Sequence, residues 1–81
     1  MVIHVLMFGT LAQELGRHAV AVDVPSPVTV QAVTHALARL FPARATLFEQ
    51  ARIAINSAFA QPDDAVHPGD EVAVIELVGG G

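Results

Sequence analysis

Apolar residues form two long runs near the ends of the chain, at residues 2–8 and 71–78. His4 is the one polar residue inside the first run, and the second is almost wholly apolar from Val72 onward. Runs of this kind are typical of strands that are covered on both faces rather than of strands at a sheet edge. We therefore predict that the first and last strands are central in a sheet.

The segment after the first run predicts a short helix and then a second strand. Residues 11–15 can form one or two helical turns, and Gly16 is suited to end them in the left-handed conformation. Residues 18–24 alternate in character, which indicates a strand that pairs with the first as a hairpin. Pro25 and Pro27 end this strand, because proline cannot donate to a strand ladder.

The middle of the chain predicts the main helix. Thr29 is a plausible N-cap, and Pro42 stops the helix. An irregular or short helical connection follows at residues 43–50, in which Leu47 and Phe48 anchor to the core. The apolar residues of the main helix that recur at three- and four-residue spacing are Val30, Val33, Leu37, Leu40 and Phe41.

Short strands and turns fill the rest of the chain. Residues 52–55 alternate at period two, Asn56 and Ser57 signal a turn, and residues 58–60 return as a short paired strand. Residues 67–70, His-Pro-Gly-Asp, predict a tight turn directly before the last strand.

This order of elements favours an α+β fold in which a mixed sheet packs on one main helix, with the first and last strands parallel and adjacent. Such an arrangement is the β-grasp. One helix covers only one face of a sheet. The other face is then either a docking surface for a partner or is covered by loops and by the residues around Leu47 and Phe48.

Composition narrows the class of protein. At 81 residues, 53% of them hydrophobic and 15% charged, the chain is expected to be one globular cytoplasmic domain. It contains no cysteine, which excludes disulfides, thiolate metal sites and thiol catalysis. No segment resembles a signal peptide or a bilayer span. The net charge of −4 makes nucleic acid and anionic membranes poor partners and favours a basic groove on a protein.

The polar residues offer no catalytic constellation of their own. His4, His18, His35 and His67 lie in different predicted elements and at no metal-ligand spacing, so no metal site is expected. The acidic pairs at 63–64 and 70–71 are typical of turn caps. No phosphate-binding loop or nucleophile elbow is present, so we expect no bound cofactor and no catalysis by the chain alone.

The chain ends in three glycines, which indicates a domain at residues 1–78 and a flexible tail at residues 79–81. A segment without side chains fits a narrow channel of a partner enzyme. The carboxylate of Gly81 would be the reacting group there. Because a carboxylate is a poor electrophile and the chain supplies no base, metal or nucleophile, another protein must activate it.

Several of these segments together resemble the small, sulfur-carrying subunit of molybdopterin synthase, one of the ubiquitin-like β-grasp sulfur carriers. The segments that carry the resemblance are Phe8-Gly9-Thr10-Leu11, Thr29-Val30, Ala54-Ile55-Asn56, Pro68-Gly69-Asp70-Glu71-Val72 and the terminal Gly80-Gly81.

The resemblance implies a role for each tail residue. Gly81 would bear an acyl-adenylate and then a thiocarboxylate, while Gly80, Gly79 and Val78 would occupy the channel of a partner. The implied partners are an adenylyltransferase like ubiquitin-activating enzymes, which uses ATP, a sulfurtransferase as the sulfur source, and the large subunit of molybdopterin synthase. The sulfur would pass to a pyranopterin precursor.

The chain departs from the family pattern before its last two glycines. Two aromatic residues and two prolines are usual there, but this chain has Val74-Ile75-Glu76-Leu77-Val78-Gly79. Two alternatives therefore stay open. One is a carrier for thiamine or another sulfur-containing metabolite, and the other is a ubiquitin-like binding module without chemistry at the tail.

Overall fold

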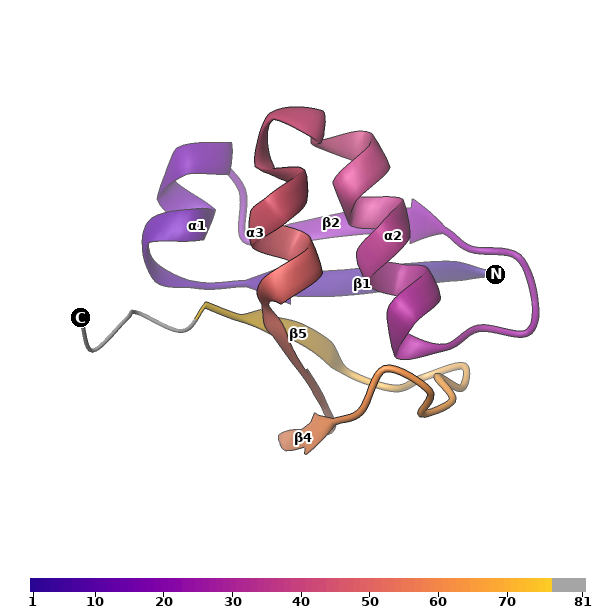
Figure 1. The fold of residues 1–81 in the computed structure, drawn as a ribbon. Coiled ribbons are helices and arrows are strands. Elements are labelled where there is room, and N and C mark those ends of the chain that lie inside the picture. Colours follow the sequence, from indigo (N-terminus) through magenta and orange to yellow (C-terminus); the bar gives the residue numbers. More distant parts are fainter. Residues whose placement is uncertain (77–81) are drawn as a thin grey trace.

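In the computed structural model, which describes residues 1–76, five strands form one mixed sheet in the order β2-β1-β5-β3-β4 (Figure 1). The elements in chain order are β1 (Val2–Met7), α1 (Gly9–Leu15), β2 (Ala19–Asp23), α2 (Val30–Leu40), a 3₁₀ turn (Pro42–Arg44), α3 (Ala45–Gln50), β3 (Arg52–Ile55), β4 (Ala58–Ala60) and β5 (Val72–Ile75).

The terminal strands lie side by side, as predicted. Strand β5 runs parallel to β1, with Val5 opposite Val72, and antiparallel to β3 on its other side. Strand β2 pairs antiparallel with β1. The predicted α+β fold, a β-grasp with its first and last strands adjacent, is confirmed. Strand β5 begins one residue later than expected, and the boundary predicted between residues 78 and 79 lies outside the described residues.

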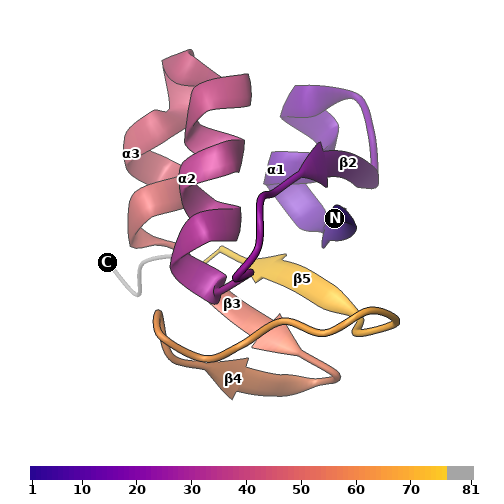
Figure 2. The ribbon, with the colours of Figure 1, turned by 90° about the vertical axis from the view of Figure 1, so that its right-hand side faces the viewer.

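The three α-helices that the structure describes within residues 1–76 lie on one side of the sheet (Figures 1 and 2). The Thr29 hydroxyl caps α2 by accepting a hydrogen bond from the N–H of Ala32 at 3.2 Å. Val30, Val33 and Leu37 are buried beneath the helix, as the spacing predicts. The prediction that Leu40, near the end of this apolar stripe, faces the sheet is wrong.

Leu40 is 51% exposed although it belongs to the apolar stripe of α2. The chain turns directly after it, and Phe41 takes the inward position instead. The Phe41 ring packs on Phe48, with the ring centroids 5.8 Å apart. Phe48 is fully buried and fastens α3 beside α2, so the predicted anchoring of this connection is confirmed.

The prediction that β1 is covered on both faces is wrong. Ile3, Val5 and Met7 are buried, but His4 is exposed and Val2 is 57% exposed. The reason is that every helix of the described part of the chain packs on the same side of the sheet (Figure 2), so that no helix within residues 1–76 covers the second side of β1. Because α3 and its Phe48 belong to the helical side, the residues around Phe48 do not cover the opposite face.

The predicted turns have the backbone conformations that their residues favour. Gly16 ends α1 with φ of 68°, and Gly69 precedes β5 with φ of 88°. Asn56 and Ser57 both have positive φ, as a two-residue hairpin between β3 and β4 requires.

Candidate functional site

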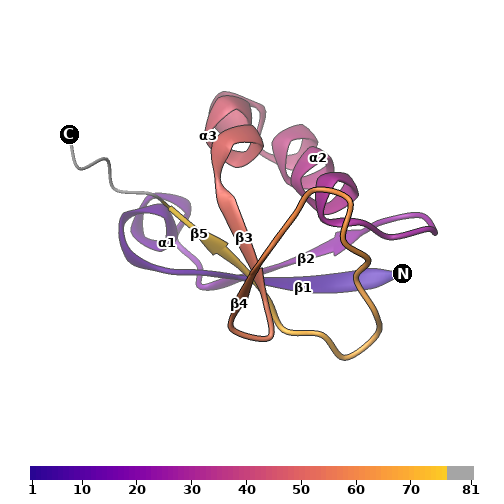
Figure 3. The same ribbon diagram turned by 60° about the horizontal axis from the view of Figure 1, so that its bottom comes forward.

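Strand β5 is the last described element before the C-terminal segment of the chain. It lies between β1 and β3, and Val74 of β5 is opposite both Met7 and Ile53. The end of β5 lies beside α1, away from the N-terminus (Figures 1 and 3). Pairing on both sides gives the end of this strand a fixed place in the fold. The predicted site residues Val78, Gly79, Gly80 and Gly81 lie outside the described residues.

An apolar hollow lies on the uncovered face of the sheet, next to the end of β5. Strand register places Leu6, Ala73, Ala54 and Phe59 in one row across four strands. The two alanines are only 7–8% exposed and form a low floor, whereas Phe59 is 59% exposed and stands at the rim. The hollow measures about 260 Å³ and is lined by Phe8, Ala54, Ser57, Phe59, Glu71, Ala73 and Ile75, which we call the open-face groove.

A second hollow of about 230 Å³ continues from the groove toward α1, and Phe8 and Ile75 line both. Phe8 was predicted as the last residue of the first strand, but it precedes α1 and is 56% exposed. Glu76 lines this second hollow. The last described residue therefore lies beside an apolar surface that continues across the sheet.

A cation lies at the rim of the open-face groove. The Arg52 guanidinium carbon is 4.5 Å from the centroid of the Phe59 ring, within the range of a cation–π contact. Arg52 is also opposite Ile75 in the register of β3 and β5. The positive charge therefore lies near the end of β5 in a chain of net charge −4.

Hydrogen bonds fasten the opposite end of β5 to the β3–β4 turn. Asn56 Nδ2 donates to Asp70 Oδ1 at 3.0 Å, and Asn56 Oδ1 accepts from the N–H of Glu71 at 2.9 Å. The N–H of His67 donates to Asp70 Oδ2 at 2.8 Å. The bond from the His67 backbone and then that from Asn56 hold the pKa of Asp70 below its ordinary value. The Asp70 carboxylate thus fastens turns, as predicted for this acidic pair, whereas Glu71 contributes its backbone N–H.

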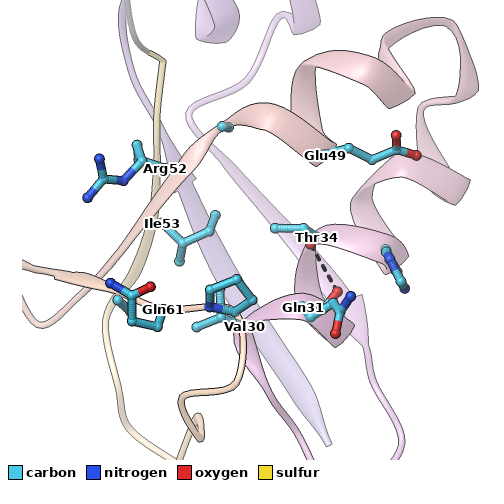
Figure 4. Close-up of a pocket in the computed structure, with 11 residues that line it drawn as sticks. Val30, Gln31, Thr34, Glu49, Arg52, Ile53 and Gln61 are labelled. Atoms are coloured by element: carbon cyan, nitrogen blue, oxygen red, sulfur yellow. Dashed lines mark hydrogen bonds between the residues drawn. The ribbon is translucent and has the colours of Figure 1, made fainter.

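A third hollow, of about 450 Å³, lies on the helical side between α2, α3, β3 and the segment after β4 (Figure 4). Val30 and Ile53 supply apolar surface at its centre. The charged groups at its rim, Arg52 and Glu49, point to opposite sides (Figure 4). Because its polar side chains do not converge, this hollow has no arrangement for acid, base or nucleophilic chemistry.

The histidines occupy separate elements and loops. His67 Nδ1 lies 3.7 Å from Asp70 Oδ2, within the turn before β5. Among residues 1–76, no group of three or more histidine and acidic side chains is placed to hold a metal ion. Over the same residues, no helix has the length and apolar character needed to cross a membrane.

Phe8 and Phe59 line the open-face groove, but the sequence interpretation gave neither of them a role in a site. Each is a large apolar residue at the end of a strand or within a very short one, where a pattern of two or three residues cannot distinguish the inner from the outer face. The available signal was the uncovered face itself, since one helical layer leaves the other face open.

Comparison with known proteins extends these observations. The ThiS family profile matches residues 5–81, which includes the terminal glycines. The crystal structure of SAMP1 from Haloferax volcanii has 27% sequence identity and a TM-score of 0.81, covering 100% of both chains. A structure of H. volcanii small archaeal modifier protein 1 has 27% identity and a TM-score of 0.80, over 95% of this chain and 98% of that chain.

A third similar structure is the putative molybdopterin converting factor, subunit 1, from Pyrococcus furiosus. It has 19% identity and a TM-score of 0.75, covering 96% of this chain and 99% of the other, and at that identity it shows the fold alone. A search of curated proteins finds no match. The fold, the central β5 and the family match over nearly the whole length agree: the chain belongs to the ThiS family of ubiquitin-like sulfur carriers.

Proposed function

We propose that this chain carries sulfur as a thiocarboxylate on Gly81 and delivers it to a pyranopterin precursor within molybdopterin synthase. The observation that carries the proposal is the match of the sulfur-carrier family through residue 81, on a chain whose central β5 leads toward that end. The fold shared with the Pyrococcus furiosus protein, described as a putative molybdopterin converting factor subunit, supports the choice of pathway.

The chemistry requires activation by a partner. An adenylyltransferase like ubiquitin-activating enzymes transfers AMP from ATP to the Gly81 carboxylate and releases pyrophosphate. The persulfide of a sulfurtransferase then attacks the acyl carbon, so that a C–S bond forms and the C–O bond to AMP breaks. A thiol then attacks the resulting acyl disulfide at the sulfur that belongs to the transferase, so that the S–S bond breaks, the thiol and the transferase are left as a disulfide, and Gly81 keeps the sulfur as a thiocarboxylate. The chain itself contributes the acyl group, and Val78, Gly79 and Gly80 form the slender segment that enters the partner's channel. ATP belongs to the partner, and the carrier binds no cofactor.

The open-face groove is suited to hold the partner while the tail reacts. Its apolar lining of Phe8, Ala54, Phe59 and Ala73 gives a contact surface without chemistry of its own. Because the groove lies beside β5, a protein bound there lies next to the end of β5, after which the chain continues to Gly81. We propose that the adenylyltransferase and the large synthase subunit both use this surface, in turn.

A second candidate is a protein modifier that is attached to other proteins through Gly81. The observation that favours it is the likeness to the two small archaeal modifier structures, which at 27% exceeds the 19% identity to the Pyrococcus protein. The chain contains no lysine, so a modifier of this sequence cannot build chains through its own ε-amines.

Intact-mass measurement tests the carrier chemistry. The full chain is incubated with a cognate adenylyltransferase, ATP and a sulfur donor, and the C-terminal peptide is then analysed. We expect one oxygen to be replaced by one sulfur, and no replacement in a variant that lacks Gly81. An unchanged mass, with the enzyme active on another carrier, would exclude the proposal.

The sulfur-loaded chain then distinguishes the pathways. Mixed with the large synthase subunit and the pyranopterin precursor, it should return to the carboxylate as the precursor gains sulfur. Transfer only to the thiamine pathway, or covalent attachment to protein amines in place of sulfur transfer, would instead support a thiamine carrier or the modifier.

A further inference from the structure

Among residues 1–76, strand β2 pairs with β1 alone and therefore forms an edge of the sheet. Two backbone hydrogen bonds fix which of its residues face β1. The N–H of Met7 donates to the His18 carbonyl at 2.8 Å, and the N–H of Val24 donates to the Met1 carbonyl at 2.9 Å. Because antiparallel pairing alternates, the even-numbered residues of β2 bond to β1. Ala19, Ala21 and Asp23 therefore direct their N–H and C=O groups outward.

This edge has little protection against pairing. The side chains of Ala19, Ala21 and Asp23 are exposed, and the first two are too small to shield the backbone. Asp23 is the one charged residue in the strand, and it forms an ion pair at 3.3 Å with the terminal amine of Met1. Unpaired edges of this length are templates for a further strand.

We propose that the β2 edge pairs antiparallel with the β2 edge of a second copy of this chain, with the two-fold axis at Ala21. In this register Ala21 lies opposite its own copy and Ala19 lies opposite Asp23 of the second copy. Every outward N–H and C=O of the three residues then has a partner.

Other registers satisfy fewer groups. Centring the pair on Asp23 places two carboxylates opposite each other and sets Ala21 against Pro25, which has no N–H. Centring it on Ala19 sets Ala21 against Arg17, whose N–H already donates to the Ala12 carbonyl at 3.1 Å. In the proposed register Arg17 of one copy lies opposite Pro25 of the second copy. Neither residue has a free N–H, so the hydrogen-bonded ladder ends at this pair on both sides of the two-fold axis.

Charge also favours the proposed register. Arg17 has the same parity as the outward residues of β2, and its side chain is exposed. It forms no ion pair with another residue in the part of the chain that the structure describes. With Ala19 opposite the second copy's Asp23, Arg17 lies diagonal to that carboxylate, within reach of a long side chain. The two-fold axis repeats the ion pair, so the edge is complementary to itself.

The paired form would leave the proposed carrier site free. Strand β2 lies at one edge of the sheet, whereas the open-face groove lies over β5, β3 and β4. The two-fold axis sets β5 of one copy antiparallel to β5 of the other, so the ends of the two strands point in opposite directions. A contact between single short strands is small, so association is expected to be weak and concentration-dependent.

Single-cysteine variants test the register, because the chain has no cysteine of its own. Residues in a hydrogen-bonded antiparallel pair have Cα atoms about 5.5 Å apart, which a disulfide can span. Under mild oxidation, A21C should form a disulfide dimer about tenfold faster than A58C, whose alanine is also exposed and lies on the other edge strand. Equal rates for the two variants would overturn the proposal.

Charge reversal gives a second test that does not depend on oxidation. In sedimentation of the full chain over a concentration series, R17E and D23R should each self-associate less than the parent chain. An equimolar mixture should recover association, because each Arg17–Asp23 contact becomes an attractive pair again. A mixture no more associated than either variant alone, with both folded by circular dichroism, would overturn the proposal whether or not Gly81 carries sulfur.

Discussion

Asp70 shows how one side chain can join turns that are distant in the sequence. It accepts hydrogen bonds from Asn56, in the β3–β4 hairpin, and from the backbone of His67, in the turn before β5. These donors stabilise the charged carboxylate, which is why its pKa lies below the ordinary value. The residue therefore contributes to stability through its charge, and that contribution depends on pH.

Acid titration should reveal this contribution. Since the pKa of Asp70 is lower in the folded chain than in the unfolded chain, its stabilisation is complete above the unfolded pKa of about 3.9 and is lost as the pH falls through the folded pKa. D70N should therefore unfold at lower urea concentration at neutral pH, and its stability should fall less on acidification from about pH 5 to about pH 2.

The matched control is Asp63, an exposed carboxylate in the loop before that turn. D63N should follow the acid dependence of the parent chain, because no hydrogen bond to the Asp63 side chain is found among the described residues. If the free energy of unfolding fell equally with pH in D70N and in the parent chain, the stabilising role of the charged Asp70 carboxylate would be contradicted.

At the scale of elements, one hydroxyl caps the start of α2. The Thr29 side chain satisfies the N–H of Ala32, which has no partner within the first turn of the helix. T29A should lower the free energy of unfolding by about 1 kcal/mol in urea titration. The control is T34A, since the Thr34 hydroxyl donates to the Gln31 carbonyl in the exposed middle of α2 at 2.9 Å. Its loss should cost less than about 0.5 kcal/mol, and equal losses would contradict the capping role.

The sequence predicted most elements because local chemistry determines them. Thr29 caps α2, Gly16 ends α1 and the Asn56-Ser57 pair reverses the chain, all through contacts within a few residues. The parallel pairing of β1 with β5 followed from their apolar character. Leu40 was assigned to the core wrongly, because its exposure depends on where Phe41 and the later α3 pack.

At the scale of the whole molecule, the two faces of the sheet differ in what they carry. The helical face holds the core, and the open face holds Phe8 and Phe59 beside the end of β5. A strand that is apolar on both faces has the same sequence pattern whichever face the helices cover. The sequence therefore indicated an uncovered face only as one of two alternatives. The tail at residues 79–81 stays a prediction from its glycines, because it lies outside the described residues, whereas the groove beside β5 needed the strand register.

This separation predicts that contact with partners can be weakened without loss of the fold. Phe59 is 59% exposed on the open face, and Leu40 is 51% exposed on α2 on the helical side, so the two are matched apolar surface residues. F59S should lower kcat/KM for adenylation of the chain by about tenfold, because an aromatic anchor of the interface is lost. L40S should leave kcat/KM unchanged, and both variants should unfold within about 0.5 kcal/mol of the parent chain. If F59S were adenylated as efficiently as L40S, the open-face groove would not be the docking surface of the activating enzyme, and the tail alone would account for recognition.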